Sequence, residues 1–291
     1  MHELIHELTH GLEHAFMDSL KILPFLFFTY LLMEYLEHKM TGKTKKVLGQ
    51  AGKTGPIWGS LLGMLPQCGF SSAASNMYAG RIITMGTLIA IFLSTSDEML
   101  PIMISEAVDP RVIGKILLIK VLIGMIAGFI IDFCITYLWK AKKREPDIHH
   151  FCEHEHCHCE NGILKPACKH TLQIWLFVLL ITFVLNVVIE MVGTATLKDM
   201  VLNQPVIGEL IAGIIGLIPN CASSVVITQL YLDGVLQFGT MMAGLLVGAG
   251  VGVLILLKVN DDKKENLKII GLLFAIGVVS GIILNLIPGL G

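Results

Sequence analysis

The sequence predicts an all-α polytopic membrane protein built from two inverted repeats. Three observations predict this fold. Apolar residues make up 54% of the 291-residue chain and charged residues only 15%, whereas soluble domains carry about 25% charged residues. The apolar residues form long blocks rather than an alternating pattern, and the two halves share a motif that interrupts an apolar block. We expect each half to hold three spans and a broken-helix hairpin, about eight to ten membrane segments in total.

Six apolar blocks are long enough, or nearly so, to cross a bilayer, which takes about 20 residues in a helix. They cover residues 20–35, 82–96, 113–139, 172–192, 238–257 and 267–288. A soluble fold could not bury so many such blocks. The first block follows fourteen residues without Lys or Arg, whereas a secretory signal peptide needs a basic start. We therefore interpret this block as a retained span.

An internal repeat relates the two halves of the chain. Residues 59–72 read GSLLGMLPQCGFSS and residues 212–224 read AGIIGLIPNCASS. With Cys68 aligned to Cys221, and with one short gap near the serines, further identical pairs follow. They are Gly63 and Gly216, Pro66 and Pro219, Tyr78 and Tyr231, Gly86 and Gly239, and Thr87 and Thr240. We interpret this self-similarity as a duplication.

The shared motif lies inside two interrupted segments, residues 55–79 and 205–230. Each has Pro, Gly and consecutive polar residues at its centre. Broken backbone at membrane depth survives only where protein or a water-filled cavity satisfies its polar groups. Each half is therefore predicted to contain a span, an interrupted hairpin and two further spans.

The distribution of basic residues predicts the topology. If each interrupted segment enters and leaves from one side, 16 of the 21 Lys and Arg lie on a single face. These residues fall in 38–53, 81, 140–169 and 258–268. The positive-inside rule then makes the central loop cytoplasmic and puts both termini on the outer side of the membrane. The halves become inverted, because each crosses the membrane an odd number of times.

The predicted organisation has four parts. Residues 1–14 form an amphipathic His-rich segment, 15–139 the first membrane repeat, 140–170 a cytoplasmic Cys/His-rich linker and 171–291 the second membrane repeat.

Inverted repeats with discontinuous helices place a substrate site at the repeat interface. We therefore predict that the two motifs face each other across a central cavity. The residues expected to line it are Gln67, Cys68, Ser71, Ser72, Asn220, Cys221, Ser223 and Ser224. In the alternative interpretation, Pro and small residues only kink two packed helices, and the two cysteines are small packing residues.

Carboxylates inside a span distinguish the first half from the second. Residues 94–98 read STSDE, and we align them with GAGVG at 248–252. An ionisable residue within a span is costly and is a functional candidate by default. We assign Asp97 and Glu98 to cation coordination or proton coupling, with Asp132 as a further candidate. The alternative places Asp97 and Glu98 in the outer headgroup zone.

Cysteine and histidine residues suggest a metal. Thiols prefer soft or borderline ions, whereas carboxylate oxygens suit harder ions such as Mn(II). The linker carries His149, His150, Cys152, His154, His156, Cys157, His158, Cys159, Cys168 and His170. Short tracts of this composition bind metals, and a cytosolic location disfavours disulfides. The spacing matches no standard zinc-finger pattern, so we predict an adaptable metal-collecting loop. The alternative is a linker that binds metals only adventitiously.

The N-terminal segment repeats histidine every four residues, at His2, His6, His10 and His14. On a helix these side chains form one stripe, and a histidine pair spaced i, i+4 can hold one metal ion. The segment is also amphipathic, as expected for a helix in the membrane interface. No cofactor is required in this interpretation, since metal ions are bound as substrate or by the linker.

Four motifs together resemble a known family. They are LPQCGFSS at 65–72, STSDE at 94–98, IPNCASS at 218–224 and GAGVG at 248–252. They are similar to bacterial arsenic or heavy-metal efflux proteins with ten membrane segments, some of which are labelled manganese transporters. The resemblance covers nearly the whole chain, except the His-rich N-terminus and the central linker. It implies export of a metal or metalloid. The positions it carries over are Pro66, Gln67, Cys68, Asp97, Glu98, Pro219, Asn220 and Cys221.

Other classes of protein fit less well. An ATP-driven pump is disfavoured. Residues 51–54 read AGKT, like the end of a phosphate-binding loop, but Val47 stands where the first glycine of that loop belongs. An enzyme with a cysteine nucleophile needs a nearby base, and no histidine lies in the predicted spans, so we expect no enzyme. A divalent-cation carrier or channel and an organic-anion exporter remain open. The expected partners are the lipid bilayer and a metal or metalloid ion, without nucleic acid, and a homodimer is left open.

Overall fold

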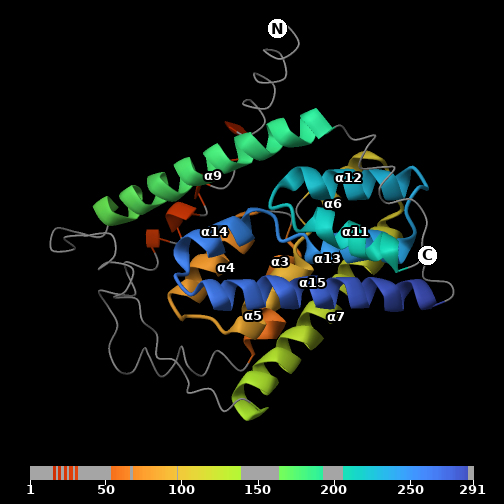
Figure 1. The fold of residues 1–291 in the computed structure, drawn as a ribbon, viewed down its shortest axis with the longest axis horizontal. Helices are drawn as coiled ribbons and strands as arrows, with labels where there is room; N and C mark the ends of the chain where they lie inside the picture. The colour runs from red at the N-terminus through yellow and green to blue at the C-terminus, as the bar shows by residue number, and fades with distance from the viewer. Residues whose placement is uncertain are drawn as a thin grey trace, which may run out of the picture.

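The computed structural model describes residues 16–17, 19–20, 23–24, 26–28, 30–31, 54–65, 68–96, 98–138, 164–192 and 206–287. These residues form helices, with no strand in this part of the chain (Figure 1). The first half contains α3 (Gly55–Gly63), α4 (Cys68–Ala79), α5 (Met85–Ser94), α6 (Met99–Ser105) and α7 (Pro110–Phe133), which continues as the π-helical turn η1 (Cys134–Leu138). The second half contains α9 (Leu164–Val192), α11 (Ile207–Gly216), α12 (Cys221–Leu232), α13 (Phe238–Val247), α14 (Val251–Val259) and α15 (Lys263–Leu286). The predicted all-α class is confirmed.

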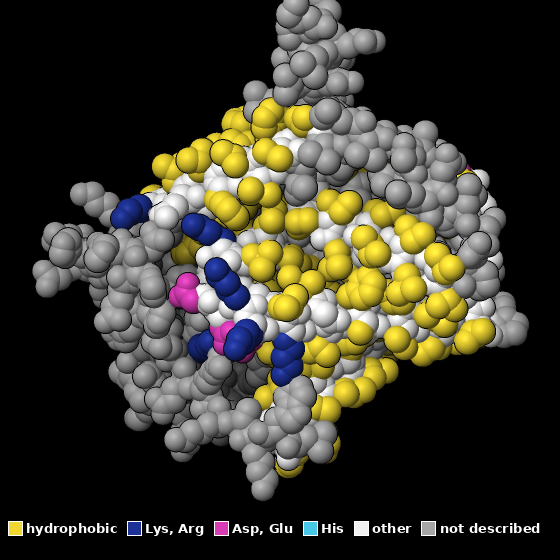
Figure 2. Space-filling model, in the orientation of Figure 1, with side chains coloured by type: hydrophobic (Ala, Val, Ile, Leu, Met, Phe, Trp, Pro, Cys, Tyr) yellow, Lys and Arg dark blue, Asp and Glu magenta, His cyan; other side chains and the backbone are white. Residues whose placement is uncertain are grey.

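The molecule has the apolar exterior of a membrane protein. Within the described residues, four helical stretches are long and apolar enough to cross a bilayer: Met85–Ser105, Pro110–Tyr137, Phe238–Val259 and Lys263–Leu286. Large apolar side chains stand exposed along the outer helices, among them Leu118, Phe133 and Ile283. Figure 2 shows this apolar surface extending over most of the visible described face. A soluble monomer rarely exposes so continuous an apolar surface, so the chain is a polytopic membrane protein.

Both predicted hairpins are broken where the shared motif lies. Helix α3 ends at Gly63 and α4 begins at Cys68. In the second half, α11 ends at Gly216 and α12 begins at Cys221. The interruptions predicted within 55–79 and 205–230 are therefore present in the backbone.

Two of the helical stretches that are long enough to cross a bilayer are also broken. Within the first, α5 ends at Ser94 and α6 begins at Met99, and within the second, α13 ends at Val247 and α14 begins at Val251. Thr95 Oγ1 donates to the carbonyl of Ile91 at 2.8 Å, a side-chain bond that competes with the helix ladder. In the second half Gly250 has φ 54°, which favours glycine. The first break falls where the predicted block 82–96 ends, and the second falls inside the predicted block 238–257.

The same contacts recur in the two halves at a constant separation of 153 residues. The N–H of Gly86 donates to Asp132 Oδ1 at 2.9 Å, and the N–H of Gly239 donates to Asn285 Oδ1 at 2.7 Å. Helix α3 packs with α5 and α7 as α11 packs with α13 and α15. Since this separation also relates the two cysteines and the two tyrosines of the repeat, the gap that we placed near the serines is not needed.

The constant separation also corrects the alignment of the second pair of motifs. Helices α5 and α13 both contain ten residues and begin at equivalent positions. Their C-caps, Thr95 and Gly248, are therefore equivalent. The sequence comparison had aligned Ser94 with Gly248, which is one residue out of register.

The equivalent helices α5 and α13 run in opposite directions along α7. Helix α5 begins beside Asp132 near the end of α7 and finishes beside Lys120. Helix α13 begins at Phe238, whose ring lies 5.7 Å from Lys115 Nζ near the start of α7. It also reaches Lys120, through Leu245. The C-terminal ends of these two helices consequently meet at the middle of α7.

The two halves interlock through their hairpins. Helix α4 of the first half packs against α14 of the second, and α12 of the second half packs against α6 of the first (Figure 1). Between α4 and α14, Ser75 Oγ donates to the carbonyl of Gly252 at 2.7 Å. The interface between the halves therefore contains the central helix breaks.

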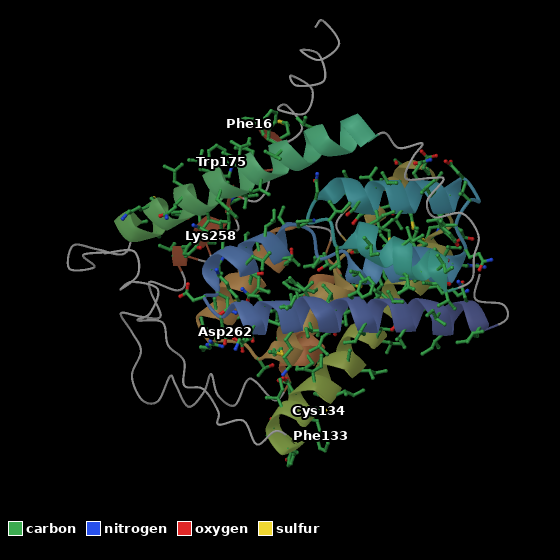
Figure 3. All side chains as sticks on the ribbon, viewed as in Figure 1. Phe16, Phe133, Cys134, Trp175, Lys258 and Asp262 are labelled. Carbon is green, nitrogen blue, oxygen red and sulfur yellow. The ribbon has the colours of Figure 1, made fainter. Side chains whose placement is uncertain are left out.

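Charged residues gather at one end of the bundle. Arg81, which follows α4, forms a salt bridge of 3.1 Å with Glu265 at the start of α15. Figure 2 shows a group of basic and acidic side chains beside the apolar face, and Figure 3 places Lys258 and Asp262 where α14 leads into α15. Arg81 and the 258–268 segment thus lie at the same end, as the charge distribution predicted.

Helix α9 lies on the outside of the bundle (Figure 3). It packs against α14, and Trp175 makes an edge-to-face contact with Phe16 at 6.2 Å between ring centroids. The helix begins at Leu164, before the end of the predicted linker. Cys168 and His170 therefore belong to a helix and not to the loop in which we placed them; Pro166 is tolerated there because it falls in the first turn.

Candidate functional site

The helix breaks of the first half contact each other. Ser96, in the break between α5 and α6, donates its hydroxyl to the carbonyl of Met64, in the break between α3 and α4, at 2.6 Å. Just before these breaks, a Cβ added to Gly63 would lie 2.2 Å from Ser94 Oγ. The ends of α3 and α5 can approach so closely only because residue 63 has no side chain.

The second half repeats this arrangement with glycine. A Cβ added to Gly216, at the end of α11, would lie 2.3 Å from the carbonyl oxygen of Gly244 in α13. One added to Gly248, in the break between α13 and α14, would lie 3.5 Å from Ser224 Oγ. The breaks between α11 and α12 and between α13 and α14 are therefore adjacent as well.

Contacts between the halves bring all four breaks to the centre. A Cβ added to Gly252, which follows the last break, would lie 2.7 Å from Ser71 Cβ on α4 and 3.0 Å from the ring of Phe92 on α5. Lys120 on α7 joins the ends of α5 and α13. A cluster of interrupted helices from both halves thus lies inside an otherwise apolar bundle.

Lys120 is buried at this centre, with 1% of its side chain exposed. Its ammonium donates to the carbonyl of Thr95, at the C-cap of α5, and to that of Leu245, in the last turn of α13, at 2.8 Å for the latter. Carbonyls at helix ends have no partner within their own helix. Lys120 therefore satisfies backbone groups that the breaks release in both halves.

Helix ends bring partial charges of both signs to the centre. Helices α5 and α13 direct their C-terminal ends at Lys120, and such ends carry a partial negative charge. Helices α4 and α12 begin at the breaks, where helix N-termini carry a partial positive charge. At the start of α12, the side chain of Asn220 accepts from the N–H of Ala222 at 3.5 Å, as an N-cap residue does.

Most predicted lining residues of the described chain are buried near these breaks. Ser71, Ser72, Asn220 and Ser223 are each at most 4% exposed, and Ser224 is half-buried. Cys68 and Cys221 are the first residues of α4 and α12. Ser71 lies beside Gly252 and Ser224 lies near Gly248, while Gln67 lies outside the described residues.

The predicted carboxylates do not form one group. Glu98 is half-buried and stands at the start of α6, whereas Asp97 lies outside the described residues. Asp132 contacts Thr84 and Gly86 at the beginning of α5. Since α5 has ten residues and a helix rises about 1.5 Å per residue, Asp132 lies roughly one helix length, about 15 Å, from the break. The structure does not bring Asp132 to the centre.

The predicted accessory metal sites fall almost entirely on residues that the structure does not describe. These are His2, His6, His10, His14, His149, His150, Cys152, His154, His156, Cys157, His158 and Cys159. On α9, Cys168 is exposed. Among the described residues, no three His, Cys, Asp or Glu side chains come close enough together to hold a metal ion.

Two buried ionisable residues were missed by sequence reasoning. One is Lys120, to which we had assigned no role. The other is Glu209 on α11, 2% exposed, whose Oε1 accepts from Asn285 Nδ2 and, at 3.5 Å, from Thr240 Oγ1. An ionisable residue inside an apolar block is itself a signal of function, and it could have identified both.

The geometry defines a helical membrane protein with an internal duplication and a central set of helix breaks. A family model described as "Putative, 10TM heavy-metal exporter" matches residues 6–196 and 172–289. The two matches cover nearly the whole chain, so the protein belongs to this family and the resemblance seen in the motifs is confirmed. No curated protein and no solved structure matches the chain.

Proposed function

We propose that this protein is a secondary transporter that exports a heavy-metal ion or a trivalent metalloid through the central site. The observation that carries the proposal is the convergence of four helix breaks, two from each half, around buried polar groups in an apolar bundle. Discontinuous helices at a repeat interface are the usual construction of a substrate site near the bilayer midplane. The family description, a heavy-metal exporter, agrees with this use of the site.

Alternating access is supported by the way the halves are related. Helices α5 and α13 have equivalent contacts within their halves and opposite directions along α7. We infer that the halves form an inverted repeat, which gives a site two equivalent routes, one to each side of the membrane. The exposed apolar sides of α7 and α15 would then face lipid.

The thiols favour a soft substrate. Cys68 and Cys221 begin the two helices that start at the breaks, and a helix N-terminus favours the thiolate form that binds metals. Thiolates select soft metal ions, and two of them suit a heavy-metal ion or a trivalent metalloid. Gln67, Asn220 and the nearby serines would supply further polar contacts, with Asp97 and Glu98 taking part in cation coordination or coupling.

We place the protein in the bacterial cytoplasmic membrane with both termini outside and residues 140–170 in the cytoplasm. The proximity of Arg81 to Glu265 supports this orientation, because it puts two basic segments at one end of the bundle. The Cys/His-rich linker would then collect metal on the side from which export begins. No enzymatic activity, cofactor or second subunit is needed for this function.

A divalent cation such as Mn(II) is the second candidate, as the substrate of a carrier or a channel. It is favoured by the oxygen atoms at or next to the breaks, namely the carbonyls of Met64, Thr95 and Leu245 and the hydroxyl of Ser96. Oxygen ligands suit hard cations better than soft ones.

The proposal can be tested by reconstituting the protein in liposomes and measuring uptake of arsenite, Cd²⁺ and Mn²⁺. We expect Cys68→Ser and Cys221→Ser to abolish transport of a soft substrate, while deletion of residues 149–159 leaves the flux through the central site. If both cysteine variants transport normally and Asp97→Asn is inactive, the thiols are packing residues and a hard cation is the substrate. If the wild type carries none of the three, transport of an organic anion becomes the function to test. Conductance without saturation would indicate a channel.

A further inference from the structure

Lys120 stands at a position where the fold does not require a charge. Its equivalent in the second half, 153 residues later, is Leu273, which is fully buried in the hydrophobic core. Helix α15 therefore fills this position with an apolar side chain while keeping the same packing of its bundle. A lysine that is 1% exposed carries a large desolvation cost. Packing alone does not explain why the first half has one.

The groups that hold Lys120 are those that would bind a cation. Its ammonium contacts the carbonyls of Thr95 and Leu245, at the C-terminal ends of α5 and α13. Transporters coordinate cations with unwound backbone carbonyls and with the C-terminal ends of half-helices. The lysine thus occupies oxygen ligands at the meeting point of the two halves, next to the proposed substrate site.

Few charged groups surround Lys120 in the described chain. Helices α3, α5, α6 and α13 contain no ionisable side chain. Glu98 lies in the turn between α5 and α6, and Asp97, which precedes it, is outside the described residues. On α7 itself, Lys115 is five residues away and Asp132 twelve. Among the described residues, the carboxyl group at the break after α5 is therefore that of Glu98.

We propose that the Lys120 ammonium is a tethered cation that a metal cation displaces from the carbonyls of Thr95 and Leu245. This inference rests on the proposed function and restricts its substrate to a cation, because a neutral metalloid would not compete with an ammonium group. Displacement requires the lysine to lose its proton, since two cations so close together in a poorly solvated site repel each other strongly.

The proton movements define an exchange cycle. A metal cation that enters from the cytoplasm takes the carbonyl oxygens, and Lys120 Nζ releases one proton to the cytoplasm and becomes a neutral amine. When the metal leaves on the outer side, the amine takes one proton from outside and the ammonium returns to the carbonyls. Each metal ion exported is thereby exchanged for one proton imported through Lys120.

The experiment uses the full-length protein in liposomes that contain a metal-sensitive dye or a pH-sensitive dye, with Cd²⁺ and Mn²⁺ each added outside. For the wild type we expect metal entry to raise the internal pH. In Lys120→Met, metal should still move down its gradient, but the pH change should fall to that of protein-free vesicles.

Lys120→Arg keeps a charge that cannot be lost, so metal flux should fall about tenfold or more. Lys115→Gln, an exposed position on the same helix, is the matched control and should behave as the wild type.

The outcomes separate this inference from the proposed function. Lys120→Met vesicles that still move protons with the metal would overturn the role of Lys120 but leave export standing, as would a wild type that carries metal without protons. A wild type that carries neither cation would overturn both. If Lys120→Met does not fold, metal binding by the wild type and by Lys120→Arg in weakly buffered detergent decides. Release of fewer protons per bound metal ion by Lys120→Arg than by the wild type supports the exchange, because the cysteine thiols also release protons on binding, and equal release by the two overturns it.

Discussion

Asn285 occupies in the second half of the chain the position that Asp132 occupies in the first. Each side chain accepts a hydrogen bond from the N–H of a glycine at the start of a buried helix, Gly86 at 2.9 Å and Gly239 at 2.7 Å. Because an uncharged amide makes this contact in the second half, the contact does not require a negative charge. The second oxygen of Asp132 accepts from Thr84 at 2.7 Å, so both of its oxygens hold the fold together.

Replacement of Asp132 should therefore separate structure from transport. Asp132→Asn keeps the acceptor for Gly86 and reproduces the second half, so we expect flux close to that of the wild type. Asp132→Ala leaves the buried N–H of Gly86 without this acceptor, which should cost about 1–3 kcal/mol, whereas the hydroxyl of Thr84 can still donate to Thr87 Oγ1, 2.8 Å away. Unfolding in detergent measures the loss of stability, and liposome flux measures the activity.

A loss of transport in Asp132→Asn would support the assignment of Asp132 to cation coordination or proton coupling. If Asp132→Asn unfolds like the wild type but carries no substrate, then the charge of Asp132 is needed for transport. Asp132 would then be a coupling residue despite its distance from the helix breaks.

The close packing of α5 against α7 depends on glycine at position 128. A Cβ added there would lie 2.6 Å from the carbonyl oxygen of Gly86 and 2.9 Å from Pro56 Cβ, and two rigid backbones cannot move apart locally. We expect Gly128→Ala to destabilise the protein by about 1–3 kcal/mol, as overpacking does. Gly114→Ala is the matched control on the same helix, because a Cβ there meets nothing within 4 Å. Equal stability of the two variants would contradict the packing described for α5 and α7.

A second glycine sets the distance between the two halves. A Cβ added to Gly252 on α14 would lie 2.7 Å from Ser71 Cβ and 3.0 Å from Phe92 of the other half. Gly252→Ala should therefore lower the melting temperature by several degrees, since about 1 kcal/mol corresponds to roughly 2–4 °C in a protein of this size. Gly271→Ala, with open space around the new methyl group, should melt with the wild type. A variant at Gly252 that melts unchanged would mean that α14 does not pack against α4 as described.

The two interrupted hairpins and the duplication could be predicted from local sequence patterns. The interruptions before Cys68 and Cys221 could be predicted because each contains a proline in an apolar segment, and proline cannot continue a helix without losing a hydrogen bond. The duplication could be predicted because identical residues recur in both halves, among them Gly86 and Gly239, which make the same contact in each half.

Other features depend on tertiary contacts that no local pattern reports. The break after Val247 contains small residues that are also common within membrane helices, so hydropathy did not predict it, whereas the break after Ser94 falls where the apolar block 82–96 ends. The contacts of Lys120 could not be predicted, because its partners Thr95 and Leu245 come from segments 150 residues apart. The lysine itself was visible as a charge in an apolar block, but only the packing of α5 and α13 against α7 shows what the charge contacts.

The orientation of the bundle can be measured by labelling with a membrane-impermeant thiol reagent. Lys264 lies in the charged end beside Arg81 and Glu265, and Ser105 ends α6 after the broken span that begins at Met85. Both side chains are exposed. In intact cells we expect Ser105→Cys to be labelled and Lys264→Cys to be protected, with the reverse in inside-out vesicles, because the basic end should face the cytoplasm. The parent protein reports the labelling of native cysteines.

Labelling of both positions from one side would show that α5 and α6 together do not cross the membrane. An inverted pattern would show that the chain is inserted the other way round.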